Sequence, residues 1–412
     1  MKDLIRHQLP NGLSVLIYPH SSSAIACCNL LYNVGSRHES PEKTGFAHLF
    51  EHLMFEGSLN IEHFDTHLQK AGGENNAFTS KDITNYYITL PPVNLETALW
   101  LESDRMLGLQ FSEKKLETQK NVVIEEFNQR YKNQPYGDSF ALLQSLAYKK
   151  HSYKWPTIGR DMDHIRNATM QDVKDFFLHH YAPNNAILAI GGNIDSSKTI
   201  GLVEKWFGSV PSRKIAHPII PIEPEQKERH FLSIEREVPS NAIYMAFHMA
   251  GRTANEFYVA DLISDILANG KSARLYQRLV KENHYFREIN AYITGDIDPG
   301  LFIISGQPAP ELSLEEAEKL IWEELTQLKE TLIPEKEMTK VKNKYEAVQQ
   351  YTETSLLHKL MQLSYHELLG GAELFEKETE RYQAVQQEDV IELAGEMFRD
   401  ENASVLYYKA KK

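Results

Sequence analysis

The stretch of the chain that decides its fold and points to its chemistry is Gly45-Phe46-Ala47-His48-Leu49-Phe50-Glu51-His52-Leu53-Met54-Phe55. Apolar residues dominate it and no proline interrupts it, so we expect an apolar helix over about 45–55. Residues four apart share one face of a helix, so His48 and His52 can present imidazole nitrogens to a single ion, as zinc prefers. Glu51 borders the same face. It can reach a metal-bound water without being a ligand.

A blander interpretation is a helix with two hydrogen-bonded core histidines. Three titratable groups stand here among apolar neighbours, and burying all three without a metal would leave polar groups that need partners. The spacing His48-x-x-Glu51-His52 is also that of the inverzincin motif. We therefore favour a zinc site with Glu51 as the catalytic residue.

A third ligand is expected from a helical pattern over 116–127. Its apolar side is expected to gather Leu116, Val122, Val123, Ile124, Phe127 and Tyr131. Glu126 falls at the edge of that side, whereas Glu125 points away from it, so Glu126 is the predicted ligand. Gln119 lies two turns earlier on the same edge, where its side chain can hydrogen-bond to a metal-ligating residue and orient it.

A glycine-punctuated turn at 71–73 precedes a segment that we expect to be a strand. An ordinary loop and strand would explain it. The functional alternative is an edge strand that pairs with an extended substrate. The predicted substrate-binding residues are then Asn76, Ala77, Phe78 and Thr79.

The length of 412 residues suggests two domains. The segment 211–228 contains Pro211, Pro218, Pro221 and Pro224 and is the predicted linker between domains 1–210 and 229–412. The two halves look like copies, because a shift of 213 residues lays the apolar frame of 47–54 on that of 260–267. A shift of 217 residues aligns the end of the first half with the end of the second half. His48, Glu51 and His52 are not repeated, so we expect the zinc motif in the N-terminal copy alone.

Composition narrows the class of protein. Hydrophobic residues make up 42% and charged residues 25%, which is ordinary for a globular protein, and a net charge of −13 argues against a nucleic-acid binder. The adjacent Cys27 and Cys28 provide no disulfide framework. The N-terminus lacks the apolar stretch of a signal peptide, and no apolar run is long enough to span a membrane. We expect a cytoplasmic protein, or a periplasmic one if a signal was removed.

Several motifs together resemble the pitrilysin and mitochondrial-processing-peptidase family. They are Asn33-Val34-Gly35-Ser36-Arg37, the stretch from His48 to Ser58, Asn76-Ala77-Phe78-Thr79-Ser80, Asn85-Tyr86-Tyr87, Val122-Val123-x-Glu125-Glu126 and Gln134-Pro135-Tyr136-Gly137. The resemblance covers the whole chain. It implies an α+β fold of two homologous, duplicated α/β-sandwich domains, each a mainly antiparallel sheet flanked by helices. It also implies one zinc per chain on His48, His52 and Glu126.

Two departures from the family pattern matter. Gln119 stands where the family usually has glutamate, so a charge behind the zinc ligands is missing. Val280 and Arg287 stand where active members often have an arginine and a tyrosine that steady the substrate carbonyl. We therefore expect a zinc endopeptidase that acts on peptides or unfolded segments with a homologous partner subunit carrying that pair, or otherwise as a homodimer. The alternative is a catalytically idle structural, assembly or peptide-binding subunit.

Overall fold

The computed structural model describes residues 3–215 and 218–411, and its contacts divide the chain into two compact units. Unit 1 comprises Met1–Phe127, Trp155–Ile220 and Gln350–Lys377, and unit 2 comprises Asn128–Lys154, Pro221–Gln349 and Glu378–Lys412. Each unit therefore takes one segment from the other half of the sequence. The limits 1–210 and 229–412 stay a prediction, and residues 216–217 of the expected linker lie outside the described residues.

Unit 1 is built on a six-stranded sheet in the order β1-β2-β6-β3-β5-β4. Its strands are β1 (Ile5–Gln8), β2 (Ser14–Pro19), β3 (Ala26–Tyr32), β4 (Glu74–Thr79), β5 (Thr84–Leu90) and β6 (Ala186–Gly192). Only the β2–β6 pair is parallel. Gly12, at φ +92°, follows Asn11 in the tight turn between β1 and β2. The central strands β3 and β6 are buried along their whole length, so helices must cover both faces.

The helices of unit 1 supply that cover. They are α1 (Phe46–Leu53), α2 (Phe64–Lys70), α3 (Leu95–Leu107), α4 (Glu113–Phe127), α6 (Met162–Arg166), α7 (Met170–His180), α8 (Ser196–Phe207) and α12 (Leu356–Leu368). Helix α12 contacts β6, β3 and β2, where Leu360 and Leu363 pack on Cys27 and Leu31. Tyr32, which alternates to the opposite face of β3, packs instead on Tyr86 and Tyr181.

Unit 2 has a five-stranded sheet in the order β7-β11-β8-β10-β9. Its strands are β7 (His230–Arg236), β8 (Ala242–His248), β9 (Phe286–Ile293), β10 (Leu301–Pro308) and β11 (Ala403–Ala410). Its helices are α5 (Ser139–Ala147), α9 (Asn255–Leu267), α10 (Leu314–Glu330), most of α11 (Glu335–Glu353) and α13 (Leu374–Ala384), and α14 (Gln387–Met397). Helix α5 covers one face through β11 and β8, and a large apolar cluster with α9, α10 and α14 fills the other.

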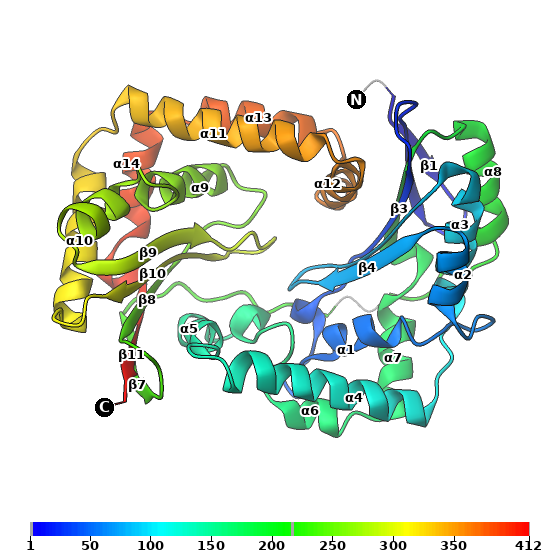
Figure 1. Ribbon diagram of the computed structural model, residues 1–412, viewed down its shortest axis with the longest axis horizontal. Coiled ribbons are helices and arrows are strands. Elements are labelled where there is room, and N and C mark those ends of the chain that lie inside the picture. Colours follow the sequence, from blue (N-terminus) through cyan, green and yellow to red (C-terminus); the bar gives the residue numbers. More distant parts are fainter. Residues whose placement is uncertain (1–2, 216–217, 412) are drawn as a thin grey trace. The chain divides into compact units, whose positions relative to one another are not determined.

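Five of the six strands of the sheet in unit 1 repeat in unit 2, and β1 has no counterpart in the sheet of unit 2. The order β2-β6-β3-β5-β4 corresponds to β7-β11-β8-β10-β9, and the pair β7–β11 is parallel like β2–β6. The predicted α+β fold with duplicated domains is thereby confirmed. Helix α5 follows α4 along the chain but packs in unit 2, and α12 follows α11 but packs in unit 1 (Figure 1). Among the described residues, no helix is both long enough and apolar enough to cross a membrane.

Candidate metal centre

Helix α1 carries the predicted motif and begins at Phe46, as the apolar pattern indicated. Its apolar side is buried, and Phe50 stacks on Phe177 and Tyr181 of the region around α7. His48 and His52 lie one turn apart with side chains 13% and 23% exposed. Their rings are 4.8 Å apart at 78°. The short helix is therefore fixed by its apolar side while its two imidazoles stay accessible.

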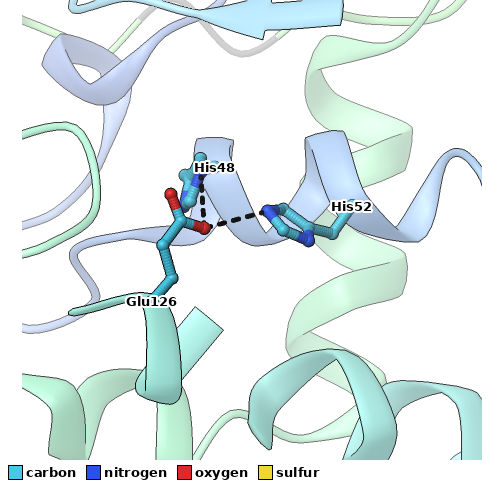
Figure 2. Close-up of side chains that lie close together, drawn as sticks. All are labelled: His48, His52 and Glu126. Atoms are coloured by element: carbon cyan, nitrogen blue, oxygen red, sulfur yellow. Dashed lines mark ion pairs between the residues drawn. The ribbon is translucent and has the colours of Figure 1, made fainter. Parts of the chain in front are cut away.

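Helix α4 brings Glu126 to these histidines, and Figure 2 shows the three side chains pointing toward one another. Glu126 Oε2 lies 3.7 Å from His48 Nε2 and 3.5 Å from His52 Nε2. Glu125 is exposed on another side of α4, as the helical phase predicted. Val122 does not follow that phase: it is 43% exposed, so the apolar side of α4 is narrower than expected. Glu126 reaches the centre because α1 and α4 pack together.

These three side chains fit a zinc ion. One ligand atom from each lies within 4.8 Å of the others, and within residues 3–215 and 218–411 this is the one such group of His, Cys, Asp and Glu. Ligands about 2.0–2.1 Å from a tetrahedral zinc stand roughly 3.3 Å apart, close to the spacings between His48, His52 and Glu126 given above. Two imidazoles and a carboxylate leave a fourth position open, which is the arrangement of catalytic rather than structural zinc.

Glu51 lies on the same helix and is held by the edge strand β4. Thr79 Oγ1 donates a hydrogen bond to Glu51 Oε2 at 2.5 Å. Thr79 was expected to bind substrate together with Asn76, Ala77 and Phe78. Strand β4 does lie at the edge of the sheet, with Asn76 and Phe78 exposed and Ala77 and Thr79 half-buried. The contact between Thr79 and the predicted catalytic glutamate was not foreseen.

The structure places the Gln119 side chain against the imidazole of His52. His52 Nδ1 lies 3.2 Å from Gln119 Oε1. The amide nitrogen of Gln119 donates in turn to the Glu56 carboxylate. Sequence reasoning missed Glu56. This residue lies three positions after the end of α1, and its side chain contacts Gln119 of α4.

A buried carboxylate caps the N-terminus of α1. Glu39 Oε2 accepts from Gly45 N–H at 2.9 Å and Oε1 accepts from Ala47 N–H at 2.8 Å, while Trp155 Nε1 donates to Oε2 at 3.2 Å. Gly45 itself, at φ +90°, has no side chain to cap the helix. Burial raises the pKa of the Glu39 carboxyl to about 8, and these three donors oppose that rise. The cap comes from Glu39, which lies six residues before Gly45 and outside the helix, so the periodicity of the helix did not reveal it.

The C-terminal end of α1 faces a buried cation. Arg105 is 1% exposed and pairs with Glu102, and its Nη1 lies 3.5 Å from the carbonyl oxygen of Met54. The guanidinium carbon lies 4.4 Å from the ring centre of Tyr86 and 4.6 Å from that of Phe64. The Glu39 carboxyl at one end and the Arg105 guanidinium at the other thus contact the backbone groups left free at the two ends of α1.

The corresponding helix of unit 2 carries other chemistry. At the predicted shift of 213, Asp261 and Asp265 of α9 occupy the places of His48 and His52, and Ser264 that of Glu51. Tyr382 Oη donates to Asp261 Oδ2 at 2.6 Å, and Lys344 Nζ lies 3.0 Å from Asp265 Oδ1.

The two residues that depart from the family's arginine–tyrosine pattern also lie in unit 2. Val280, in the helical turn Tyr276–Glu282, packs partly buried on the apolar core. Arg287 is exposed on β9.

Comparisons with known proteins show the class to which this two-unit repeated α+β fold belongs, which is that of the M16 peptidases. The model of Insulinase (Peptidase family M16) matches residues 15–161, and that of the Peptidase M16 inactive domain matches residues 167–345. This chain belongs to peptidase family M16. The first match contains His48 and His52, and the second contains Asp261 and Asp265.

Relatives of this chain include named zinc proteases. The zinc protease PqqE of Helicobacter pylori is 31% identical over 341 residues, which are 81% of this chain and 76% of that protein. A crystal structure of a protease from Helicobacter pylori superposes with a TM-score of 0.91 at 27% identity, covering 98% of this chain and 99% of that one. The mitochondrial-processing peptidase subunit beta of Saccharomyces cerevisiae is 26% identical over 269 residues, covering 66% of this chain and 57% of that protein.

Proposed function

We propose that this chain is a zinc-dependent endopeptidase that hydrolyses peptides or unfolded segments of polypeptide. The observation that carries the proposal is the convergence of His48, His52 and Glu126, with Glu51 beside them on α1. The names of the relatives support a zinc protease. One zinc per chain would be held by the two imidazoles and the carboxylate, which leave one position open.

Zinc held by His48, His52 and Glu126 would lower the pKa of a water at the open position to near 7 and would polarise the scissile carbonyl. The Glu51 carboxylate would accept a proton from the attacking water and return it to the leaving amine. The hydroxyl of Thr79 donates to the Glu51 carboxylate and restrains its position. The substrate pairs as an added strand with the exposed edge β4 along Asn76 to Thr79, which brings its backbone past α1.

We further propose that the active form is an assembly with a homologous chain that carries the arginine–tyrosine pair. Val280 cannot donate a hydrogen bond, and a missing transition-state donor costs about 10²–10³ in rate. One relative is named as the beta subunit of a processing peptidase, so a chain of this family can be one subunit of an enzyme. A homodimer is the alternative assembly. The alternative function is a catalytically idle structural or peptide-binding subunit, which the same missing pair favours.

The test measures metal and turnover together. The purified protein should contain about one zinc per chain by mass spectrometry, should cleave an unstructured quenched-fluorescent peptide, and should lose cleavage to a chelator and regain it with zinc. His48→Ala should lose the metal, whereas Asp261→Asn, the change at the matched position of α9, should keep it. Zinc retained in full by His48→Ala would overturn the site.

The partner is tested by mixing. Cleavage by this chain should rise when a homologous chain with the arginine–tyrosine pair is added, and light scattering should show a mass of both chains. Full activity of the isolated chain, unchanged by the addition, would overturn the partner proposal. Zinc binding with no cleavage in either state would favour the idle subunit.

A further inference from the structure

The imidazole of His52 is oriented by an amide rather than by a carboxylate. Gln119 Oε1 lies 3.2 Å from His52 Nδ1. A carbonyl oxygen can only accept, so Nδ1 carries the hydrogen, and the Nε2 lone pair is left facing Glu126. A neutral amide is a weaker acceptor than a carboxylate for the imidazole N–H. On its own, Gln119 would fix the tautomer of His52 but add no charge.

The other end of the same amide is bound to a carboxylate. Gln119 Nε2 donates to Glu56 Oε1, and the Glu56 side chain is half-buried. Lys115, four residues before Gln119 on the same side of α4, donates through Nζ to the backbone oxygen of Glu56. One face of α4 thus holds both the backbone and the side chain of Glu56 in place.

Hydrogen bonds in such a chain strengthen one another. A carboxylate that accepts from the amide N–H of Gln119 draws electron density onto Oε1, which makes that oxygen a better acceptor for His52 Nδ1–H. The bond from the amide to Glu56 is itself charge-assisted. The expected result is a His52 imidazole that is held in one orientation and one tautomer and that donates its Nε2 lone pair more strongly to a divalent cation.

We propose that Glu56 is a positioning residue that acts on His52 through Gln119, so that the Gln119–Glu56 pair does the work of a carboxylate placed directly against the imidazole. The inference rests on the proposed function, because it takes His52 to be a zinc ligand. It assigns a role to Glu56 that the inverzincin motif does not contain.

The test is a double-mutant cycle on zinc affinity, measured by competition with a chelator of known affinity. Glu56→Gln and Gln119→Met should each weaken zinc binding about 10-fold or more, as is typical of partners behind metal ligands. Once Gln119 is methionine, changing Glu56 should have no further effect. Glu125→Gln removes the same charge beside the site and serves as the matched control, with an affinity close to wild type.

Two further measurements separate positioning from general destabilisation. The visible spectrum of the cobalt-substituted protein should shift in Glu56→Gln but not in Glu125→Gln. Gln119→Glu, introduced into the Glu56→Gln protein, should restore zinc affinity, because a carboxylate then contacts His52 directly. Wild-type affinity in Glu56→Gln, or additive losses in the cycle, would overturn the inference. Zinc kept by His52→Ala would instead overturn the proposed function.

Discussion

Helices α1 with α4 in unit 1, and α9 with α11 in unit 2, occupy the same places in the repeat and differ in what their facing side chains do. In unit 1, two imidazoles and the Glu126 carboxylate converge within 4.8 Å. In unit 2, the aspartates of α9 bind a tyrosine and the ammonium group of Lys344. A cation is thus part of the chain in unit 2, whereas the donors of unit 1 have the geometry to hold one from solution.

The comparison shows that the buried apolar residues of the repeated helix are kept in both units although its polar residues differ. Phe50 of α1 and Ile263 of α9 are both fully buried, although the neighbours that face the opposite helix differ in charge and chemistry. The inactive-domain match over 167–345 fits this division. Catalysis can therefore reside in one copy while the other keeps the architecture, and changes at matched positions should have unequal consequences.

Of all the matched positions, 51 and 264 should differ most in the effect that a substitution has on kcat. Glu51→Gln should keep its zinc and lose about 10²–10⁴-fold in kcat, because glutamine cannot accept the proton of the attacking water. Ser264→Ala should leave both unchanged. Steady-state kinetics with metal analysis of both proteins measures this. A Glu51→Gln enzyme with most of its turnover would remove Glu51 from the mechanism.

A second comparison separates neighbours on α4. Glu126→Gln should weaken zinc more than about 100-fold, beyond the 10–100-fold typical of residues behind the ligands. Glu125→Gln should change it little, since that side chain is exposed and its charge is screened. Chelator competition gives both affinities. The reverse ranking would show that α4 presents its other glutamate to the centre.

Removing the Tyr382 hydroxyl, which donates a hydrogen bond to Asp261, should destabilise the protein but leave its zinc content unchanged. Tyr382→Phe should lower the free energy of unfolding by about 1.5–3 kcal/mol, the range for a hydrogen bond to a charged group. Burial raises the pKa of Asp261 and the Tyr382 hydroxyl opposes that rise. Without the hydroxyl this pKa rises further, so more stability is lost as the pH increases. Denaturant unfolding should therefore show a larger loss at pH 7.5 than at pH 4.5, and an equal loss would contradict this.

The smallest effect is expected for the ion pair of unit 2. Lys344 is 39% exposed and Asp265 is 16% exposed, so solvent screens their interaction. Lys344→Met should lower the free energy of unfolding by less than about 1 kcal/mol. Urea titration measures it, with zinc content as the control. A loss of several kcal/mol would mean that the pair is as essential to unit 2 as the histidines are proposed to be to unit 1.

Local periodicity was enough to predict much of this molecule. The apolar side of α1 depends on residues within a few turns of one another, and the structure has it. The same short-range reasoning chose Glu126 over Glu125, and Glu126 lies beside the two histidines. The repeat came from comparing segments 213 residues apart, and the two sheets repeat five strands. The zinc assignment itself stays a prediction.

Contacts between distant segments were beyond that reasoning. The Glu39 cap lies outside the helix it serves, and Glu56 reaches His52 only through another helix. Arg105 of α3 contacts the C-terminal end of α1 because α3 packs on strands β3 and β5 of the sheet. Helix α12 joins unit 1 through residues such as Ser364, which contacts Asn29 from the far end of the chain.

The exchange of α5 and α12 has a consequence for synthesis on the ribosome. All six strands of the sheet in unit 1 have been synthesised once Gly192 is added, yet the helix that covers one face of the sheet is encoded by residues 356–368. One apolar face of this sheet must therefore stay uncovered while most of unit 2 is translated. During that time the exposed face is a binding surface for chaperones. For the same reason, a cut of the gene within 211–228 would give two fragments of which neither encodes a complete unit.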